Sequence, residues 1–289
     1  MPYNPTPQDL IKSAAEIARS PAKLTAKLRV LRKYSLLGPL MPDARLGGIV
    51  MFHAGRSGSS VLASLLDQHP QVYWGQEIYL PHFKAVGVRT RIDVDPLVLL
   101  NRASRWVGRR YFGFEVKFWH LHQTGVALDD YLDVLRDFGV QHFIILERKN
   151  LLRRLVSSQI GSTHKRMVVK KSEATSLLTI ELPVQHLEHQ TGESTLIEYL
   201  EQQQANFERL RTLLASEQAL ELSSAEDIFP NPVRGYERVC DFVGLKAVPA
   251  EVPTRRVNPY PLQAMLSNFA EVEAALQNTP FEWMLYDTD

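Results

Sequence analysis

A long apolar strand that runs directly into a short glycine-rich turn is the feature that most restricts how this chain can fold. Residues 48–53 form a nearly continuous apolar run, residues 54–58 contain two glycines and a serine, and residues 59–68 have the composition of a helix. A strand that is apolar throughout is typical of burial on both faces, as in a parallel sheet covered by helices. The segment therefore predicts the strand, turn and helix of an α/β domain.

Strands and helices continue to alternate along the chain. Further strands are predicted at 72–74, 114–118, 142–146 and near 220–222, and helices are predicted at 129–138, 151–160 and 195–214. This alternation predicts an α/β fold, with a mostly parallel β-sheet flanked by helices on both faces.

Composition limits the functions that the chain can have. It has 289 residues, with 33 Lys and Arg against 32 Asp and Glu, and this balance disfavours a nucleic-acid partner, which needs a basic surface. The single cysteine, Cys240, excludes a disulfide framework and is interpreted as a small core residue. No segment has the length and apolarity of a membrane span, and residues 1–5 do not resemble a secretory signal. A cytoplasmic protein is expected.

Residues 1–46 are predicted to be a basic helical extension, and residues 47–289 the main domain. Seven basic residues lie from Lys12 to Lys33 with one acid, Glu16, and apolar residues recur between them near helical spacing. A solvated helix packed on the domain is the simpler interpretation. The alternative is an interfacial helix that makes peripheral contact with a membrane or an anionic polysaccharide. The pattern does not fix the oligomeric state.

The glycine-rich turn has the residues of a phosphate-binding loop. Gly55, Ser57 and Gly58 are small enough to let the backbone amides point inward, and Arg56 adds a positive charge. The helix that begins at Ser59 contributes its unsatisfied amides and the positive end of its dipole. A strand, a tight turn and a helix in this order form the usual geometry of a phosphate site.

The turn differs from the loop of nucleoside triphosphatases. Such a loop ends in Gly-Lys followed by Ser or Thr, whereas here Gly58 is followed by Ser59 and Ser60. The lysine that reaches the β- and γ-phosphates is therefore missing. This favours a nucleotide with one 5′-phosphate that carries a transferable group. A P-loop kinase or NTPase, and a nucleotide-binding module without catalysis, stay as alternatives.

Two segments together resemble sulfotransferases that use 3′-phosphoadenosine 5′-phosphosulfate (PAPS). Residues 56–60 and 65–70 look like the 5′-phosphosulfate loop of that family, and residues 146–158 look like its 3′-phosphate segment. The resemblance implies a P-loop-like fold, PAPS as donor, adenosine 3′,5′-bisphosphate as product and no metal. It also implies that the acceptor is a hydroxyl of a carbohydrate or glycolipid.

The same resemblance assigns residues to the 3′-phosphate. Arg148 at the strand end and Ser157 on the following helix are the first assignment, because a guanidinium and a hydroxyl suit a dianion. The more usual spacing of the family pairs Lys149 with Ser157, so Lys149 stays as an alternate. Arg153 and Arg154, on the same helix, are interpreted as a solvated face.

A base must take the proton from the acceptor hydroxyl. Glu77, after the second strand, stands where related enzymes place a catalytic carboxylate. His120 and His122 are its rivals, since imidazole titrates in the right range. Lys117 is expected either to contact the sulfuryl oxygens or to pair with a carboxylate. No cluster of Cys or carboxylates completes a metal site around the two histidines.

Residues 161–193 are predicted to form a long loop. A loop of this length in a compact domain is often a functional lid. Its basic half, from His164 to Lys171, would suit an anionic acceptor.

Overall fold

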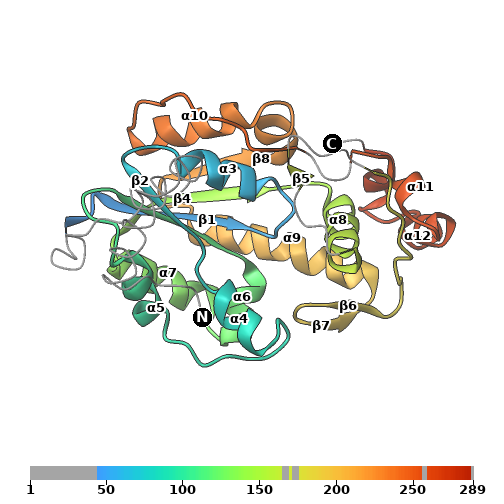
Figure 1. The fold of residues 1–289 in the computed structure, drawn as a ribbon. Helices are drawn as coiled ribbons and strands as arrows, with labels where there is room; N and C mark the ends of the chain where they lie inside the picture. The colour runs from blue at the N-terminus through green and yellow to red at the C-terminus, as the bar shows by residue number, and fades with distance from the viewer. Residues whose placement is uncertain (1–43, 165–168, 171–175, 256–258, 288–289) are drawn as a thin grey trace, which may run out of the picture.

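A five-stranded sheet, parallel throughout, forms the centre of the molecule (Figure 1). The computed structural model describes residues 44–164, 169–170, 176–255 and 259–287. The strands follow the order β2-β3-β1-β4-β8. Their bounds are β1 (Gly47–His53), β2 (Val72–Glu77), β3 (Tyr111–Val116), β4 (Val140–Glu147) and β8 (Ala219–Ser223). The predicted α/β class with a parallel sheet is confirmed.

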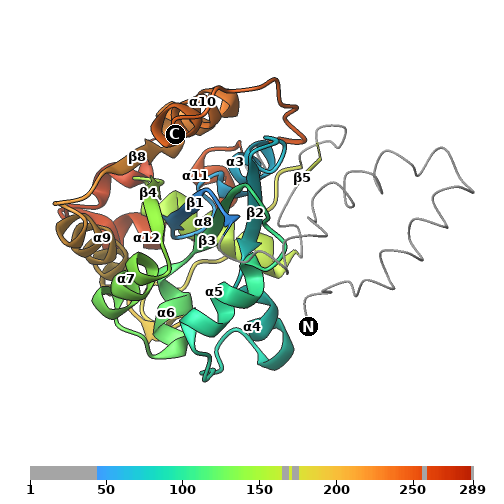
Figure 2. The same cartoon turned by 90° about the vertical axis from the view of Figure 1, so that its left-hand side faces the viewer.

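Helices cover both faces of the sheet (Figures 1 and 2). On one face lie α3 (Ser59–Leu66) and α10 (Pro232–Val243), and on the other lie α5 (Pro96–Ser104), α7 (Leu128–Asp137) and α9 (Leu196–Leu213). The side chains of β1 alternate between these layers. Ile49 and Met51 pack with α3 and α10, whereas Val50 and Phe52 pack with α5, α7 and α9. The apolar run of β1 is therefore buried on both faces, as predicted.

Strand β3 begins and ends earlier than the predicted range 114–118. It stops at Val116, and Lys117 is the N-cap of α6 (Phe118–Thr124). The backbone amide of Lys117 donates to Nδ1 of His120 at 3.1 Å. The pairing of β3 with β1 ends at Val116, so Lys117 lies at the edge of the sheet and not within a strand.

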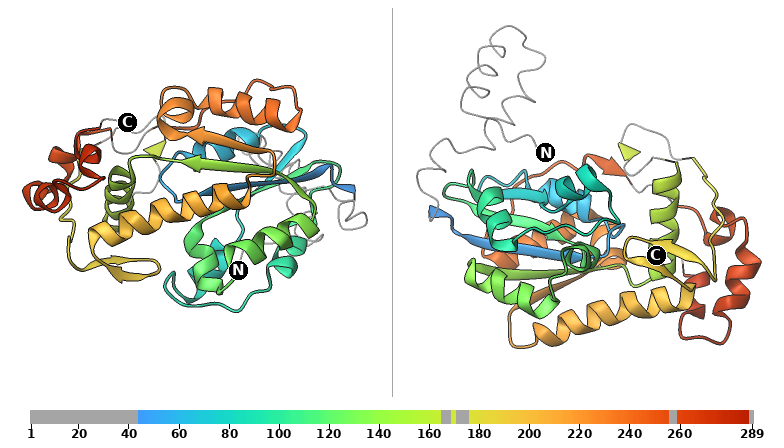
Figure 3. Two further views of the ribbon diagram at one scale, coloured as in Figure 1. Left: turned by 180° about the vertical axis from the view of Figure 1, so that it is seen from behind. Right: turned by 90° about the horizontal axis from the view of Figure 1, so that it is seen from below.

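The prediction of an unbroken loop over 161–193 is wrong. Helix α8 (Leu151–Thr163) extends into it, and its last part is a hairpin of β6 (Leu187–His189) and β7 (Gly192–Ser194). Two more short strands, β5 (Val169–Lys170) and β9 (Thr254–Arg255), pair with each other. The hairpin lies beside the N-terminal end of α9 (Figure 3), which starts with a capping box between Thr195 and Glu198.

The C-terminal part of the chain packs against α8. Asn150, the N-cap of α8, accepts the amide hydrogen of Arg153 and donates through Nδ2 to the carbonyl of Met284, each at 2.8 Å. The start of α8 is therefore held both by its own N-cap and by the C-terminal segment.

The remaining elements are α4 (Leu80–Val86), η4 (Ser224–Ile228), α11 (Leu262–Met265), α12 (Phe269–Leu276) and η5 (Glu282–Leu285).

The predicted extension at 1–46 falls largely outside the described residues, and the division at residue 46 stays a prediction. Within the part of the chain that the structure describes, no helix combines the length and the apolarity needed to cross a membrane. Cys240, on α10, is buried in the core that this helix forms with α3, as predicted.

Candidate functional site

The loop between β1 and α3 has a tightly curled backbone. Gly55, Arg56 and Gly58 have φ angles of 84°, 58° and 83°. Gly58 is the N-cap of α3, and no side chain caps the helix there. A Cβ on Gly58 would lie 2.4 Å from Cγ2 of Ile228, so glycine is required by space as well as by conformation. The first amides of α3 are left for a ligand at this helix start.

A turn of π-helix, η4, supports the loop from below. Its first residue, Ser224, is fully buried and donates through Oγ to the carbonyl of Ser57 at 2.7 Å. The same hydroxyl lies 3.1 Å from the carbonyl of Glu147 at the end of β4. One side chain therefore ties the loop to the neighbouring strand. Ser224 was not predicted as a site residue, since a lone serine after a strand carries no distinctive signal.

Three arginines converge on the loop. Arg56 donates through Nε to Oγ of Ser157 at 3.1 Å. Arg154 donates to the carbonyl of Ala54 at 2.7 Å, and Nη1 of Arg148 lies 3.4 Å from the carbonyl of Arg56. The loop from β1 and the segment from β4 to α8, two candidate phosphate-binding segments far apart in the sequence, therefore form one site.

The interpretation of Arg153 and Arg154 as a solvated face is wrong. Both are at least 95% buried, with exposed fractions of 3% and 5%. Arg153 donates to the carbonyl of Tyr260, and Arg154 donates to the hydroxyl of Tyr199, over whose ring it also lies. This burial could not be read from the local pattern, because the groups that cover α8 come from distant segments.

The buried arginines lie close enough together for the charge of one to lower the pKa of another. Burial and then the charge of Arg148 lower the pKa of Arg56 to about 10. Burial, followed by the charges of Arg148 and Arg56, lowers the pKa of Arg154 to about 10. Both groups stay protonated at neutral pH. Positive charges gathered in a poorly solvated place are stabilised by a bound anion.

The two alternative residues at the strand end of β4 differ in burial. Arg148 is 5% exposed and lies over the ring of Phe229, 4.9 Å from its centroid. Lys149 is exposed on the surface. Ser157 is buried beside Arg56. Arg148 and Ser157, the first assignment, therefore both contact Arg56, while their role toward a 3′-phosphate stays a prediction.

Glu77 lies at the same edge of the sheet, at the end of β2. Its Oε2 is 2.7 Å from Nζ of Lys117 and 3.5 Å from Nε2 of His120. Burial raises the pKa of Glu77, but the hydrogen bond of His120 and the charges of Lys117 and His53 outweigh it, so the pKa lies well below its ordinary value. The carboxylate is ionised at neutral pH.

His120 supports Glu77 from behind. It is fully buried and does not line the cavity described below. Because the amide of Lys117 donates to Nδ1, the neutral ring carries its proton on Nε2, toward Glu77. Burial lowers the pKa of His120 to about 4, although the hydrogen bond with Glu77 acts to raise it. This geometry suits a residue that orients Glu77.

A second buried histidine lies under the loop. His53, at the end of β1, accepts the amide hydrogen of Gly55 at Nδ1 and places Nε2 at 3.2 Å from Glu115. The other oxygen of Glu115 accepts the indole hydrogen of Trp74, also at 3.2 Å. This group, which was not predicted from the sequence, ties three adjacent strands to the loop.

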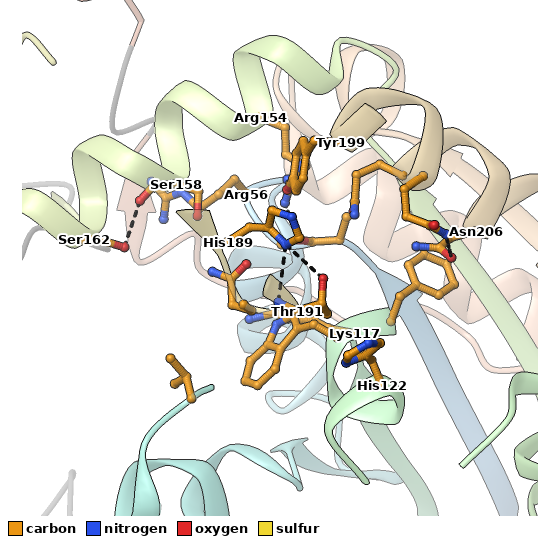
Figure 4. Close-up of a pocket in the computed structure, with 18 of the residues that line it drawn as sticks. Arg56, Lys117, His122, Arg154, Ser158, Ser162, His189, Thr191, Tyr199 and Asn206 are labelled. Atoms are coloured by element: carbon orange, nitrogen blue, oxygen red, sulfur yellow. Dashed lines mark hydrogen bonds between the residues drawn. The ribbon is translucent and has the colours of Figure 1, made fainter. Parts of the chain in front are cut away.

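A cavity of about 780 Å³ opens above these residues. Arg56, Ser59, Ser60, Glu77 and Lys117 line it, whereas Ser57, Arg148, His120 and Ser157 lie in the layer beneath. Its far wall comes from the β6–β7 hairpin, from α9 and from His122. Figure 4 shows Tyr199 on this wall, with His189 joined to Thr191, and Arg154 of α8 beside Tyr199.

Among the described residues there is no group of three or more His, Cys, Asp or Glu placed to hold a metal ion. The comparison with family models, the comparison with curated proteins and the comparison with solved structures found no match for this chain. The assignment of function therefore depends on the site itself.

Proposed function

We propose that this protein is a PAPS-dependent sulfotransferase that transfers a sulfuryl group to a hydroxyl of a carbohydrate or glycolipid. The observation that carries the proposal is the meeting of Arg56 and Arg154, with Arg148 buried behind Arg56, at a glycine loop beside the ionised carboxylate of Glu77. It joins an anion site and a proton acceptor in one cavity, which is what transfer from an anionic donor to a hydroxyl requires.

The donor would occupy two anion subsites. The 5′-phosphosulfate would lie over the loop, against the first amides of α3, with Ser59 and Ser60 as hydroxyl donors. The 3′-phosphate would lie toward Arg148 and Ser157. A P-loop kinase or NTPase fits less well, because no lysine precedes Ser59 to reach further phosphates.

The reaction would be an in-line displacement at sulfur. Glu77 takes the proton from the acceptor hydroxyl, whose oxygen forms a bond to sulfur. The bond between sulfur and the bridging oxygen of the phosphosulfate breaks, and its electron pair leaves with adenosine 3′,5′-bisphosphate. Arg56 and the loop amides stabilise the negative charge that grows on the bridging oxygen. The sulfate ester is the second product.

The far wall of the cavity favours an uncharged polyol as acceptor. Its neutral polar side chains include Gln190, Thr191, Ser194, Gln202, Gln203 and Asn206. Amides and hydroxyls both donate and accept hydrogen bonds, as sugar hydroxyls do. Trp119 adds an aromatic surface on which the apolar face of a sugar ring can pack. The basic half of the predicted loop, from which an anionic acceptor was inferred, largely falls outside the described residues.

Ligand-induced thermal stabilisation tests the donor site. Adenosine 3′,5′-bisphosphate at about a hundred times its Kd should stabilise the protein by about 2.7 kcal/mol, whereas ATP with magnesium should have little effect. The reverse result would support a P-loop NTPase. Stabilisation by the bisphosphate, without transfer of labelled sulfate from PAPS to any of a panel of glycans and glycolipids, would support a nucleotide-binding module instead.

A further inference from the structure

Lys117 lies between the loop and Glu77. Its Nζ is 2.7 Å from Oε2 of Glu77, and a Cβ placed on Gly55 would lie 3.4 Å from Cε and 3.8 Å from Nζ of the same lysine. Both charged side chains line the cavity. The ammonium group is therefore within reach of the carboxylate on one side and of an anion held by the loop on the other.

The backbone of Lys117 is fixed, whereas its side chain has room to move. The amide is held by Nδ1 of His120, and the residue joins the end of β3 to the start of α6. From this anchor a flexible four-carbon stem carries the ammonium group into the cavity. A shift of the charge toward the loop requires rotation of the side chain and no movement of the sheet or helix.

The pairing seen here makes Glu77 a weak base. Glu77 faces Lys117 at the end of β3, His120 on α6 and His53 on β1, and these three lower its pKa against the effect of burial. A carboxylate with so low a pKa takes up a proton poorly. Removal of one neighbouring positive charge raises the pKa of a carboxyl, and the remaining burial acts in the same direction.

We propose that Lys117 is a positioning residue gated by the donor: it pairs with Glu77 while the loop is empty, and it shifts to an anionic oxygen of the donor when the loop is filled. Glu77 is then free to accept the proton of the acceptor hydroxyl. This inference rests on the proposed function, since it requires an anionic donor in the loop. It makes donor binding a condition for proton abstraction, so that the acceptor hydroxyl keeps its proton until the donor is in place.

The titration of Glu77 tests this inference without any need for turnover. The protein is labelled with ¹³C at the glutamate carboxyl carbons, and the signal of Glu77 is assigned by its loss in Glu77→Gln. In the free protein it should titrate well below the ordinary range. Adenosine 3′,5′-bisphosphate should raise its pKa by at least about 1 unit, the size of effect expected from the loss of an adjacent opposite charge. Adenosine 3′-monophosphate, which leaves the loop without a phosphate, should not.

Two lysine variants make the assignment specific. In Lys117→Met the pKa of Glu77 should already be raised in the free protein, and the ligand should change it little. Lys84→Met removes a charge from another part of the cavity wall and should behave like the wild type. If the bisphosphate binds the wild type and the titration of Glu77 does not change, the role of Lys117 is refuted while the donor site stands. If the bisphosphate does not bind, the proposed function fails and this inference with it.

Discussion

At the scale of single residues, Glu77 and His120 differ in what each can do. Glu77 reaches the cavity, whereas His120 is buried behind it with one ring nitrogen occupied by the amide of Lys117. Only the carboxylate is placed to meet a substrate. His122 lines the cavity but is exposed on α6, with no carboxylate to orient it among its described contacts.

Glu77→Gln should therefore reduce turnover and leave the donor site intact. The amide keeps the shape of the side chain but accepts no proton at neutral pH, so we expect a loss of about 10²–10⁴ in kcat, without weaker binding of adenosine 3′,5′-bisphosphate. Steady-state kinetics and calorimetry measure the two quantities. His122→Ala is the control and should cost far less. Near-normal turnover in Glu77→Gln together with an inactive His122→Ala would move the base to His122.

Arg153 and Arg154 form a matched pair of neighbouring, equally buried cations. Arg154 bonds to the loop at Ala54, whereas Arg153 bonds to Tyr260 on the other side of α8. Arg154→Met should weaken the binding of adenosine 3′,5′-bisphosphate by about 10- to 100-fold, since a hydrogen bond to a charged group contributes about 1.5–3 kcal/mol. Arg153→Met should lower the melting temperature with little effect on the affinity. Equal losses of affinity in the two variants would show that the loop contact of Arg154 is not specific.

At the scale of elements, the junction of the loop with α3 depends on space and not only on backbone conformation. Gly58 and Gly244 have similar positive φ angles, 83° and 74°, but a Cβ on Gly58 would strike Ile228, whereas a Cβ on Gly244 would have no heavy atom within 4 Å. Substitutions at the two positions therefore distinguish the cost of a left-handed backbone from the cost of a steric clash.

Gly244→Ala should destabilise the protein by about 1–2 kcal/mol, the cost of a left-handed conformation for an ordinary residue. Gly58→Ala should cost at least about 1 kcal/mol more, since overpacking adds to the strain. It should also weaken donor binding, because the first amides of α3 must shift. Urea unfolding of both variants measures the difference. Equal destabilisation would mean that η4 moves aside without cost.

The strands and main helices of this fold could be predicted from the sequence because each carries its own pattern. The apolar runs of β1 and β4 and the helical spacing in α9 depend on neighbouring residues alone. The place where β3 ends could not be predicted, since it depends on a bond between Lys117 and His120. The burial of Arg154 was missed for a similar reason: Tyr199, which covers it, comes from a helix distant in the sequence.

The candidate site was predictable in part. The loop and the segment after β4 carry recognisable residues, and the parallel order of the strands brings both to the same edge of the sheet. Ser224 and the pair His53 and Glu115 act through tertiary contacts, and such contacts leave no local pattern in the sequence.

At the scale of the whole molecule, buried His120 makes stability depend on pH. Its pKa of about 4 is below the value of about 6.5 expected in the unfolded chain, so the unfolded state binds a proton more readily. The contribution of His120 is present above pH 6.5 and is lost as the pH falls toward 4. The free energy of unfolding should decrease over this window, by up to about 1.4 kcal/mol per pH unit from this residue.

Urea unfolding at pH 7, 6, 5 and 4 measures this decrease. His120→Gln should flatten it, because the variant has no imidazole to protonate. His122→Gln changes an exposed histidine on the same helix and serves as the control. A decrease that is as steep in His120→Gln as in the wild type would assign the acid sensitivity to other groups.

The central place of β1 has a consequence for how the newly made chain reaches this structure. Gly47 pairs with Tyr111 on one side, and Ile49 pairs with His142 on the other. The strand that carries the loop is thus made early, yet both of its neighbours come from much later in synthesis. Until they arrive, an apolar segment has two open edges, and pairing over such distances is slow. The chain is exposed to aggregation during this interval, so its yield in the cell should depend on chaperones that shield β1.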